Sequence, residues 1–553
     1  MKILLIQPPM RDFYQTSIRT QPIGLAYLAA SLKTKGHAVE ILDCQTEKKK
    51  SIPIPSELSY LKDFYPFDDR SPFKLYTGYY HFGMEWEEIG QRIKNSKADA
   101  FGISSSFTPY HGEALKIAQI IKDWDRRKIV AMGGAHVSCD PEGVLKSPFV
   151  DFVVLGEGEV RFPFLLEQIR RGRLKNIEQI DGMGYRRDGE IQINPVQDFI
   201  RDLDSLPHPA RELLDPDRYR IGKKRSTMII TSRGCPHGCA YCSAHLVMGR
   251  FFRSRTPEAI LEEMTECRTE YGIEIFDIED DNFTFDQGRA KKLMSLVIDN
   301  FGEGAIKLSA MNGVSFASLD EELLRLMKRG GFDTINLSFV SIDSSTKERM
   351  RRPKPAAEFD KVVEKAEQVG LNVIGYAIMG MPGQTIEEME DTLIDLMGRR
   401  VLIGPSVYYP TPGTPLFEAC EKEGILPPDL SQWRSTALPL ETEKFSRLDL
   451  ITLFRLARCI NFLKGKIDRR ELDEGITWEE LIVALQEKAK GEGKDNGGSW
   501  IDLLLLLVNE RSFFGLKKDS EGVSFVKEGS SKKVLDYFFE KAWRSPVVKS
   551  RNT

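Results

Sequence analysis

Short apolar, β-branched runs alternate with amphipathic stretches of helical period along the first 175 residues. The apolar runs predict strands at 2–7, 38–43, 98–104, 128–132 and 151–155. A helix is predicted over 22–35, with Pro22 in its first turn and Gly36 just past its end. Parallel strands that are covered on both faces show this near-continuous apolar character. The predicted fold class is therefore α/β, with a flavodoxin-like (Rossmann-like), doubly wound sheet first.

A polar, proline-spotted stretch then interrupts the pattern, which restarts as alternating strand and helix from Met228. Further strands are predicted near 274–278, 307–310, 334–339, 372–378 and 404–409, with helices over 257–271 and 319–329. Six βα units predict a partial (βα)6 TIM-type barrel, in which chemistry gathers at the carboxyl ends of the strands. The chain after about 428 has a mostly α-helical pattern. The predicted domains are 1–175, a linker at 176–225, the barrel at 226–428 and a helical C-terminal domain at 429–553.

Three of the eight cysteines follow the first strand of the barrel at the spacing C-x3-C-x2-C: Cys235, Cys239 and Cys242. Three thiolates within eight residues predict a loop closed around a metal centre. Three ligands on a [4Fe–4S] cluster would leave one iron without a protein ligand, open to a cofactor or substrate. A zinc site would normally close with a fourth nearby Cys or His. His237 and His245 are the nearby histidines, and His237 lies inside the loop, so zinc is disfavoured.

The predicted carboxyl ends of the first sheet are small, polar or flexible. Such loops allow close backbone approach to a large ligand, although each alone is also typical of a tight βα turn. The candidate binding residues there are Pro8, Ser104, Ser105, Ser106, Phe107, Gly133, Gly134, His136, Gly156, Glu157 and Gly158.

The residues at 22–29, 133–136 and 156–159 make this unit resemble the cobalamin-binding domain found in one large class of radical S-adenosylmethionine (SAM) enzymes. The cysteine spacing with Tyr241 before the last cysteine is similar to the signature of those enzymes, and the resemblance spans about residues 1–430. It implies a [4Fe–4S] cluster, SAM and cobalamin (methylcobalamin) as cofactors. The chain lacks D-x-H-x-x-G, which implies no histidine below the cobalt and, for His136, contact with a corrin side chain or a turn role.

The resemblance also implies a SAM site at the strand ends that follow the cysteines. The segment at 278–283 looks like the acidic end of the second strand, and the one at 375–385 is similar to the motif of the fifth strand. The implied SAM-binding residues are Tyr241, Asp280, Asp281, Ser338, Ser341, Ile378, Gly380 and Met381. In the fourth strand Val340 takes the place of the usual glutamate, and either Asp343 or Ser338 would have to compensate.

Methyl transfer to an unactivated carbon through a 5′-deoxyadenosyl radical and methylcobalamin is the function that the resemblance favours. Oxidation, cyclisation or rearrangement with the same cofactors is the alternative, and a non-catalytic cobalamin or iron–sulfur sensor is an alternative of another class. A methylthiotransferase is disfavoured, because the N-terminal unit has no second cysteine triad. The implied partners are a small-molecule, lipid or peptide substrate and an electron donor such as flavodoxin or ferredoxin.

Composition narrows these expectations only a little. A net charge of −4 over 553 residues gives no reason to expect a nucleic-acid partner, because phosphate binding needs a concentrated basic patch. The apolar runs at 2–7 and 501–508 are too short for a signal peptide or a membrane span. Clustered and scattered cysteines without a secretory signal indicate the cytoplasm. The long aromatic segment at 46–84 either lines or lids the cavity between cofactor and substrate, or forms a packed satellite cluster.

Overall fold

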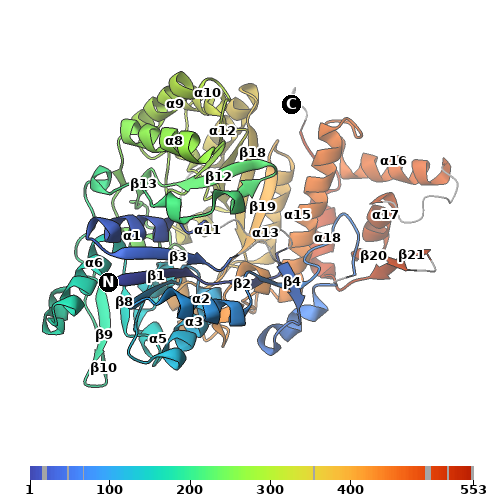
Figure 1. The fold of residues 1–553 in the computed structure, drawn as a ribbon. Coiled ribbons are helices and arrows are strands. Elements are labelled where there is room, and N and C mark those ends of the chain that lie inside the picture. Colours follow the sequence, from blue (N-terminus) through green and yellow to red (C-terminus); the bar gives the residue numbers. More distant parts are fainter. Residues whose placement is uncertain are drawn as a thin grey trace.

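The computed structural model describes residues 1–14, 21–45, 49–66, 68–352, 355–491, 500–519 and 522–549. Its first unit is a seven-stranded sheet with the order β10-β9-β8-β7-β6-β1-β3 (Figure 1). The strands are β1 (Lys2–Gln7), β3 (Ala38–Asp43), β6 (Ala100–Ser104), β7 (Ile129–Gly133), β8 (Phe152–Val154), β9 (Met183–Arg187) and β10 (Glu190–Ile193). The first five are mutually parallel, and their order is that of the predicted flavodoxin-like sheet.

Alternate residues of β1 send their side chains into two separate cores. Ile3 and Leu5 pack with α1 (Ile23–Thr34) and α6 (Gly158–Arg170) on one face of the sheet. Leu4 and Ile6 pack with α2 (Trp86–Ser96) and α3 (His111–Trp124) on the other. All four side chains are at most 3% exposed. A strand apolar at every position is therefore explained by burial on both faces.

The sheet continues past residue 175 into the segment predicted as a linker. β9 pairs antiparallel with β8, and β10 pairs antiparallel with β9 at the edge of the sheet. Asp188 and Gly189 join the two strands and both have positive φ, as the tight turn of a two-residue hairpin requires. The polar composition of an edge hairpin resembles that of a linker, but the Asp-Gly pair is a hairpin signal.

A partial barrel of six parallel strands forms the second unit. Its strands lie in two sheets, β11-β12-β15-β16 and β17-β18-β19, with a parallel bridge from Leu308 to Phe332 between them. They are β11 (Arg220–Ile221, an antiparallel edge), β12 (Lys224–Ile229), β15 (Ile275–Ile278), β16 (Lys307–Ser309), β17 (Thr334–Val340), β18 (Asn372–Met379) and β19 (Leu402–Val407). The covering helices are α8 (Pro257–Tyr271), α9 (Gln287–Phe301), α10 (Glu321–Gly330), α12 (Ala356–Gln368) and α13 (Ile386–Met397).

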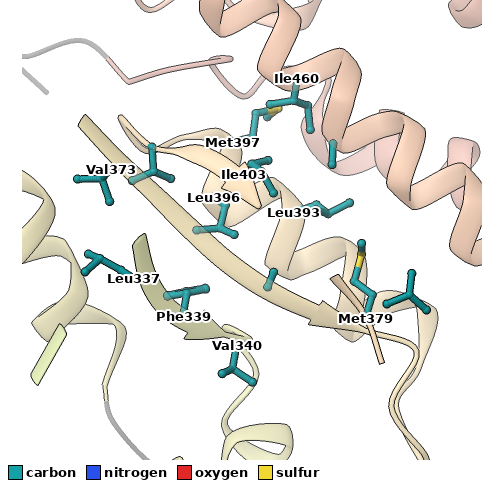
Figure 2. Packing of buried hydrophobic residues seen from close by; sticks show 14 of the residues in the cluster. Leu337, Phe339, Val340, Val373, Met379, Leu393, Leu396, Met397, Ile403 and Ile460 are labelled. Carbon is teal, nitrogen blue, oxygen red and sulfur yellow. The ribbon is translucent and has the colours of Figure 1, made fainter. Parts of the chain in front are cut away.

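Alternation along the barrel strands separates a helix-facing core from the barrel interior. Leu337 and Phe339 of β17 are buried in the same cluster as Leu393 and Leu396 of α13 (Figure 2). Ile460 of α15 (Arg447–Asp468) extends this cluster from outside the barrel. Side chains on a strand alternate between its two faces, so Asn336 and Ser338 face the barrel interior.

The C-terminal region is mostly helical, and it also holds an antiparallel hairpin. Its helices are α14 (Pro415–Lys422), α15, α16 (Trp478–Gly491), α17 (Trp500–Glu510) and α18 (Lys532–Ala542), and its hairpin is β20 (Phe514–Asp519) with β21 (Gly522–Lys527). α15 closes the side of the barrel beside β19, where the Asn461 amide bonds the N–H and the C=O of Ile403. Among the described residues, no helix has both the length and the apolar character that crossing a membrane requires.

The aromatic segment predicted at 46–84 packs between the first sheet and this C-terminal region. It contains β4 (Lys49–Ile52) and β5 (Tyr79–Phe82), which pair with each other and, through β5, with β2 (Met10–Asp12). The rings of Phe73 and Phe462 lie 5.4 Å apart, and the Tyr65 hydroxyl donates to the Thr436 carbonyl at 2.6 Å. These contacts favour the packed-cluster hypothesis. Residues 46–48 and 67 lie outside the described part of the segment.

Candidate cofactor site

The two ends of the cysteine loop are joined at its base by a two-stranded antiparallel ribbon. β13 (Ser232–Arg233) pairs antiparallel with β14 (Arg253–Ser254), and the loop and α7 (Ala244–Met248) run between them. Gly234 begins the loop with φ +80°, and a Cβ atom there would lie 2.3 Å from the Phe251 carbonyl oxygen. Only glycine fits this turn. The Gly234 N–H donates to Asp281 Oδ2 at 3.0 Å, which ties the loop to the end of β15.

Two of the three sulfurs in this loop receive a hydrogen bond from a side chain. Asn282 Nδ2 donates to Cys235 Sγ at 3.7 Å, and Arg352 Nη1 donates to Cys239 Sγ at 3.6 Å. Cys235 and Cys242 are partly exposed, while Cys239 is 9% exposed. Burial raises the pKa of Cys242 to about 11, so this thiol would lose its proton on binding a metal. Two of the sulfurs are thus partly accessible, and two receive a hydrogen bond from a side chain.

The ligand set of this loop fits a cluster better than a single metal ion. Within the described chain, no three Cys, His, Asp or Glu side chains converge as the ligands of one ion would. In a [4Fe–4S] cluster each cysteine binds a different iron, so the three sulfurs surround the cluster and lie farther apart than the ligands of one ion do. His245 Nδ1 bonds the Cys242 carbonyl at 3.1 Å, and the His237 ring packs 6.1 Å from that of Phe285.

The two predicted aspartates at the end of β15 have different surroundings. Asp280 is 2% exposed and accepts hydrogen bonds from the Thr231 N–H at 2.7 Å and the Ser232 hydroxyl at 2.6 Å. Its carboxylate is therefore occupied by the turn that precedes the cysteines. Asp281 is exposed at the loop and accepts from the Gly234 N–H. Partial desolvation by the surrounding loop raises the pKa of Asp281.

A second pair of carboxyl groups faces the barrel interior just before these aspartates. Asp277 accepts from the Ser309 hydroxyl at 2.7 Å, and Glu279 accepts from the Asn312 amide at 2.9 Å. Desolvation, followed by the adjacent Asp277 carboxylate, raises the pKa of Glu279 to about 7. The pair thus carries a proton near neutral pH. Sequence reasoning did not single it out, although the alternation of Phe276 and Ile278 toward the core was a usable signal.

The end of β17 has a valine at the position where a glutamate is expected. Val340 has φ +70°, a conformation that β-branched residues rarely adopt, at an irregularity in the pairing with β18. Ser341 is fully buried and shares a 3.1 Å hydrogen bond with Thr392. Asp343 caps α11 (Ser344–Arg349) by accepting from the Thr346 N–H at 2.6 Å. Ser338 alone of these polar groups lies partly exposed on the interior face.

The turn after β18 is closed by a glutamine that sequence reasoning missed. Gln384 accepts from the Met381 N–H at 3.2 Å and donates to the Ile378 carbonyl at 3.5 Å. Gly380 has φ +76°, and Met381 is fully buried. Ile378 is partly exposed, so its face of the turn is open to the barrel interior. Tyr241 is partly buried, with its hydroxyl hydrogen-bonded to Cys239.

Most polar residues at the carboxyl ends of the first sheet are used within the chain. Ser105 is 3% exposed and shares a 3.0 Å hydrogen bond with His111 Nδ1. His136 is 2% exposed and bonds Thr108 Oγ1 at 3.1 Å, with its ring 4.3 Å from that of His111. Desolvation lowers the pKa of His111 to about 3 and that of His136 to about 4, so both are neutral at pH 7. His136 is therefore buried within these turns and bonded to one of them.

Another group at these strand ends is open or shaped for close approach. Phe107 is 51% exposed, and Ser106 beside it is exposed. Ser104 shares a 3.2 Å hydrogen bond with Ser106. Gly134 has φ +114°, and a Cβ there would lie 2.7 Å from the Ser105 carbonyl oxygen. The remaining predicted residues lie in the same turns: Gly133 and Gly156 partly exposed, Gly158 at the start of α6, and Pro8 buried with its carbonyl bonded to Gln45 at 3.1 Å.

Glu157 joins this end of the sheet to the cysteine ribbon. Its carboxylate lies 2.8 Å from Arg233 and 2.8 Å from Arg253, and all three side chains are at most 4% exposed. Glu159 adds a 2.6 Å contact to Arg233. The prediction of Glu157 as a cobalamin contact identified the loop but not the two arginines. Nothing in the local sequence distinguishes a buried arginine from an exposed one.

An open flavodoxin-like sheet facing a three-cysteine loop on a partial barrel defines a protein with two cofactor-binding units. Residues 229–396 match the model of the Radical SAM superfamily, and residues 77–166 match that of the B12 binding domain. The chain therefore contains a B12-binding domain followed by a radical SAM domain, the combination that defines the cobalamin-dependent radical SAM family.

Proteins of known name or structure resemble this chain over most of its length. An uncharacterized methyltransferase of Pyrococcus horikoshii is 28% identical over 485 residues, which is 86% of this chain and 95% of that protein. Cytidylyl-2-hydroxyethylphosphonate methyltransferase of Streptomyces wedmorensis is 28% identical over 79% of this chain and 84% of that protein. The solved structure of the radical SAM methyltransferase TsrM from Kitasatospora setae aligns with TM-score 0.58 at 18% identity, over 76% of this chain and 75% of that one.

Proposed function

We propose that the chain is a cobalamin-dependent radical SAM methyltransferase that acts on a carbon atom of a small-molecule, lipid or peptide substrate. One observation carries this proposal. The three-cysteine loop stands at the carboxyl end of the first barrel strand and is joined by buried ion pairs to the carboxyl end of the flavodoxin-like sheet. The names of the two relatives, both methyltransferases, support methyl transfer over other outcomes of the same cofactors.

In this proposal Cys235, Cys239 and Cys242 hold the [4Fe–4S] cluster, and SAM occupies its open iron. When bound, the cluster supplies the electron that cleaves SAM, and methylcobalamin supplies the methyl group. The side chains of this protein position the cofactors. Arg352 and Asn282 direct N–H groups at two sulfurs, which stabilises their negative charge. The electron would come from a flavodoxin or ferredoxin.

The SAM site is proposed at the ends of β15, β17 and β18. Asp281 and Ser338 are accessible polar groups at these strand ends, and Ile378 and Tyr241 are accessible beside them. Gly380 and Met381 shape the turn. Asp280 and Ser341 are occupied by protein hydrogen bonds, so their proposed role is to hold the loops that contact SAM. Because Asp343 is occupied as a helix cap, Ser338 is the proposed substitute for the missing glutamate.

Cobalamin is proposed to lie over the carboxyl ends of β1, β6, β7 and β8. The accessible groups there are Ser104, Ser106, Phe107, Gly133 and Gly156. A bare glycine backbone lets a large ring approach closely, and an exposed phenylalanine offers it an apolar face. Pro8, Ser105, Gly134, His136, Glu157 and Gly158 are proposed to shape these loops from behind.

The deciding experiment follows a methyl label. The protein would be reconstituted anaerobically with ferrous iron, sulfide and hydroxocobalamin, then incubated with reductant, methyl-labelled SAM and a small-molecule extract. Methyl transfer predicts a labelled product together with 5′-deoxyadenosine and S-adenosylhomocysteine. Turnover without S-adenosylhomocysteine would exclude methylation, and no reductive SAM cleavage at all would favour a sensor. The Cys235, Cys239 and Cys242 triple alanine variant is the control.

A further inference from the structure

Glu157 is the centre of a buried cluster of charged side chains that no sequence motif predicted. Oε1 accepts from Arg233 and Arg253, each at 2.8 Å, and Oε2 accepts from the Ile200 N–H at 2.8 Å. The Glu157 side chain is fully buried, and each arginine side chain is 4% exposed. With Glu159 bonded to Arg233, the cluster contains two negative and two positive groups.

The position of these charges links the two proposed cofactor sites. Glu157 lies in the loop between β8 and α6, at the cobalamin end of the first sheet. Arg233 and Arg253 are directly paired residues of β13 and β14, the two strands from which the cysteine loop emerges. Arg233 is two residues before Cys235 in the sequence. A single carboxylate therefore bonds both strands of the ribbon at the base of the cysteine loop.

Neighbouring contacts make the junction rigid. The Arg253 guanidinium lies 5.3 Å from the Phe199 ring centre and 5.1 Å from that of Phe251. The Arg233 guanidinium lies 5.4 Å from the ring of Tyr27 in α1. A Cβ atom on Gly156 would lie 3.2 Å from the Val247 carbonyl of α7, so the two loops also touch through their backbones.

Separating the loops would leave charges buried without partners, which is far more costly than separating apolar surfaces of the same size. The ribbon and the loop must therefore move together, or both must become exposed to water. Any ligand that orders the loop at 156–158 would then also order the ribbon, and this coupling is reciprocal by linkage.

We propose that Glu157 is a positioning residue that couples occupancy of the cobalamin site to the closure of the cysteine loop. This inference rests on the proposed function, because it takes cobalamin as the ligand of the first sheet. Cobalamin binding holds the Glu157 loop in place, and the loop holds β13 and β14 together. The cluster is then retained more tightly in the cobalamin-bound protein than in the cobalamin-free protein.

The test measures how fast iron is lost from the full-length, reconstituted protein to an iron chelator, with and without hydroxocobalamin. Cobalamin is expected to slow the loss at least about fivefold in the natural protein, the lower end of typical coupling between sites. Glu157→Gln keeps the shape and the acceptor for the Ile200 N–H but removes the charge. It is expected to bind cobalamin, seen in the visible spectrum, and to lose this protection.

Glu263 offers a matched control. It is also fully buried between two arginines, 2.7 Å from Arg211 and bonded to Arg255, but it contacts neither the Glu157 loop nor β13. Glu263→Gln should therefore cost a similar amount of stability and keep the cobalamin protection. Equal loss in both variants would show a general effect of instability and overturn the proposal, as would protection that survives in Glu157→Gln.

A second measurement covers the case in which Glu157→Gln does not hold iron. Hydrogen exchange of the amides at 232–254 needs no cluster, and cobalamin should slow it in the natural protein and in Glu263→Gln but not in Glu157→Gln. Arg253→Lys, which keeps the charge, should retain part of the effect. Failure of the natural protein to bind cobalamin would overturn the proposed function, whereas binding without slower exchange would overturn only the coupling.

Discussion

The two α/β units present polar loops at the carboxyl ends of their strands, and they use those loops differently. At the first sheet Ser105, His136 and Glu157 are at most 3% exposed and are bonded to other residues of the chain. At the barrel Cys235, Cys242 and Asp281 remain accessible. Polarity at a strand end therefore does not distinguish the groups that are buried and bonded within the chain from the groups that remain accessible to a ligand, whereas burial and internal hydrogen bonds do.

The largest effect is expected when one of the three cysteines is removed from the barrel loop. Cys235→Ala, Cys239→Ala and Cys242→Ala are each expected to abolish iron–sulfur loading and reductive SAM cleavage, because two thiolates cannot hold the cluster. Iron and sulfide analysis after reconstitution and assay of 5′-deoxyadenosine measure this. Cys44→Ala changes a fully buried cysteine of the first sheet and should keep its iron. Full iron content in any of the three variants would contradict the cluster assignment.

The next effect concerns the hydrogen bond that Arg352 donates to the Cys239 sulfur. Arg352→Met removes a positive N–H donor from Cys239 Sγ, so the reduced cluster loses stabilisation and its reduction potential should fall. The rate of SAM cleavage is expected to fall about 10- to 100-fold, as for other residues that hold metal ligands. An EPR-monitored redox titration measures the potential. Arg349→Met, on the partly exposed side of α11, serves as the control and should leave the potential unchanged.

Hydrophobic pattern was sufficient to predict the fold because burial on two faces gives a strand a continuous apolar run, while a covering helix shows an apolar stripe of helical period. The ranges 2–7 and 38–43 coincide with β1 and β3, and 257–271 coincides with α8. The hairpins β9–β10 and β20–β21 were missed because their outer strands β10 and β21 bury too few residues to show an apolar pattern. In the second case the sequence was assigned to a helical region.

The site was predictable where chemistry fixes the residue type and less so where packing decides. The cysteine spacing identified the loop, and the acidic segment after it identified the end of β15. Arg233, Arg253 and Arg352 approach from parts of the chain remote from their partners, so no local pattern could pair them. Likewise, only the three-dimensional contacts distinguish Asp280, whose carboxylate accepts hydrogen bonds from the protein, from Asp281, which is accessible.

A smaller effect is expected at the first sheet, where the loss of stability in acid tests whether His136 is buried and neutral. The pKa of His136 is lowered to about 4 by burial, while its unfolded value lies near 6.5. Below pH 6.5 the unfolded chain therefore binds a proton that the folded chain does not, and stability falls as the pH falls toward 4. His136→Asn should remove about 2–3 kcal/mol of this acid destabilisation. Urea unfolding of both proteins at pH 7 and pH 4.5 measures it, and equal pH dependence would contradict the buried, neutral assignment.

The smallest effect is expected at Glu279, which faces the barrel interior at the end of β15. Its folded pKa of about 7 is raised above the usual value of 4.5, so between these values the folded chain holds a proton that the unfolded chain lacks. Stability from this group is present below pH 4.5 and is lost as the pH rises through 7. Glu279→Gln cannot ionise and keeps a donor toward Asp277. At pH 8 linkage alone would give it a gain of about 3 kcal/mol relative to the natural protein, which solvent screening of this partly exposed group reduces to about 1 kcal/mol, and at pH 4.5 it should gain nothing. Urea unfolding at the two pH values measures the difference. A gain of the same size at both would mean that Glu279 is ionised in the folded protein, and that the barrel interior is as well solvated as its surface.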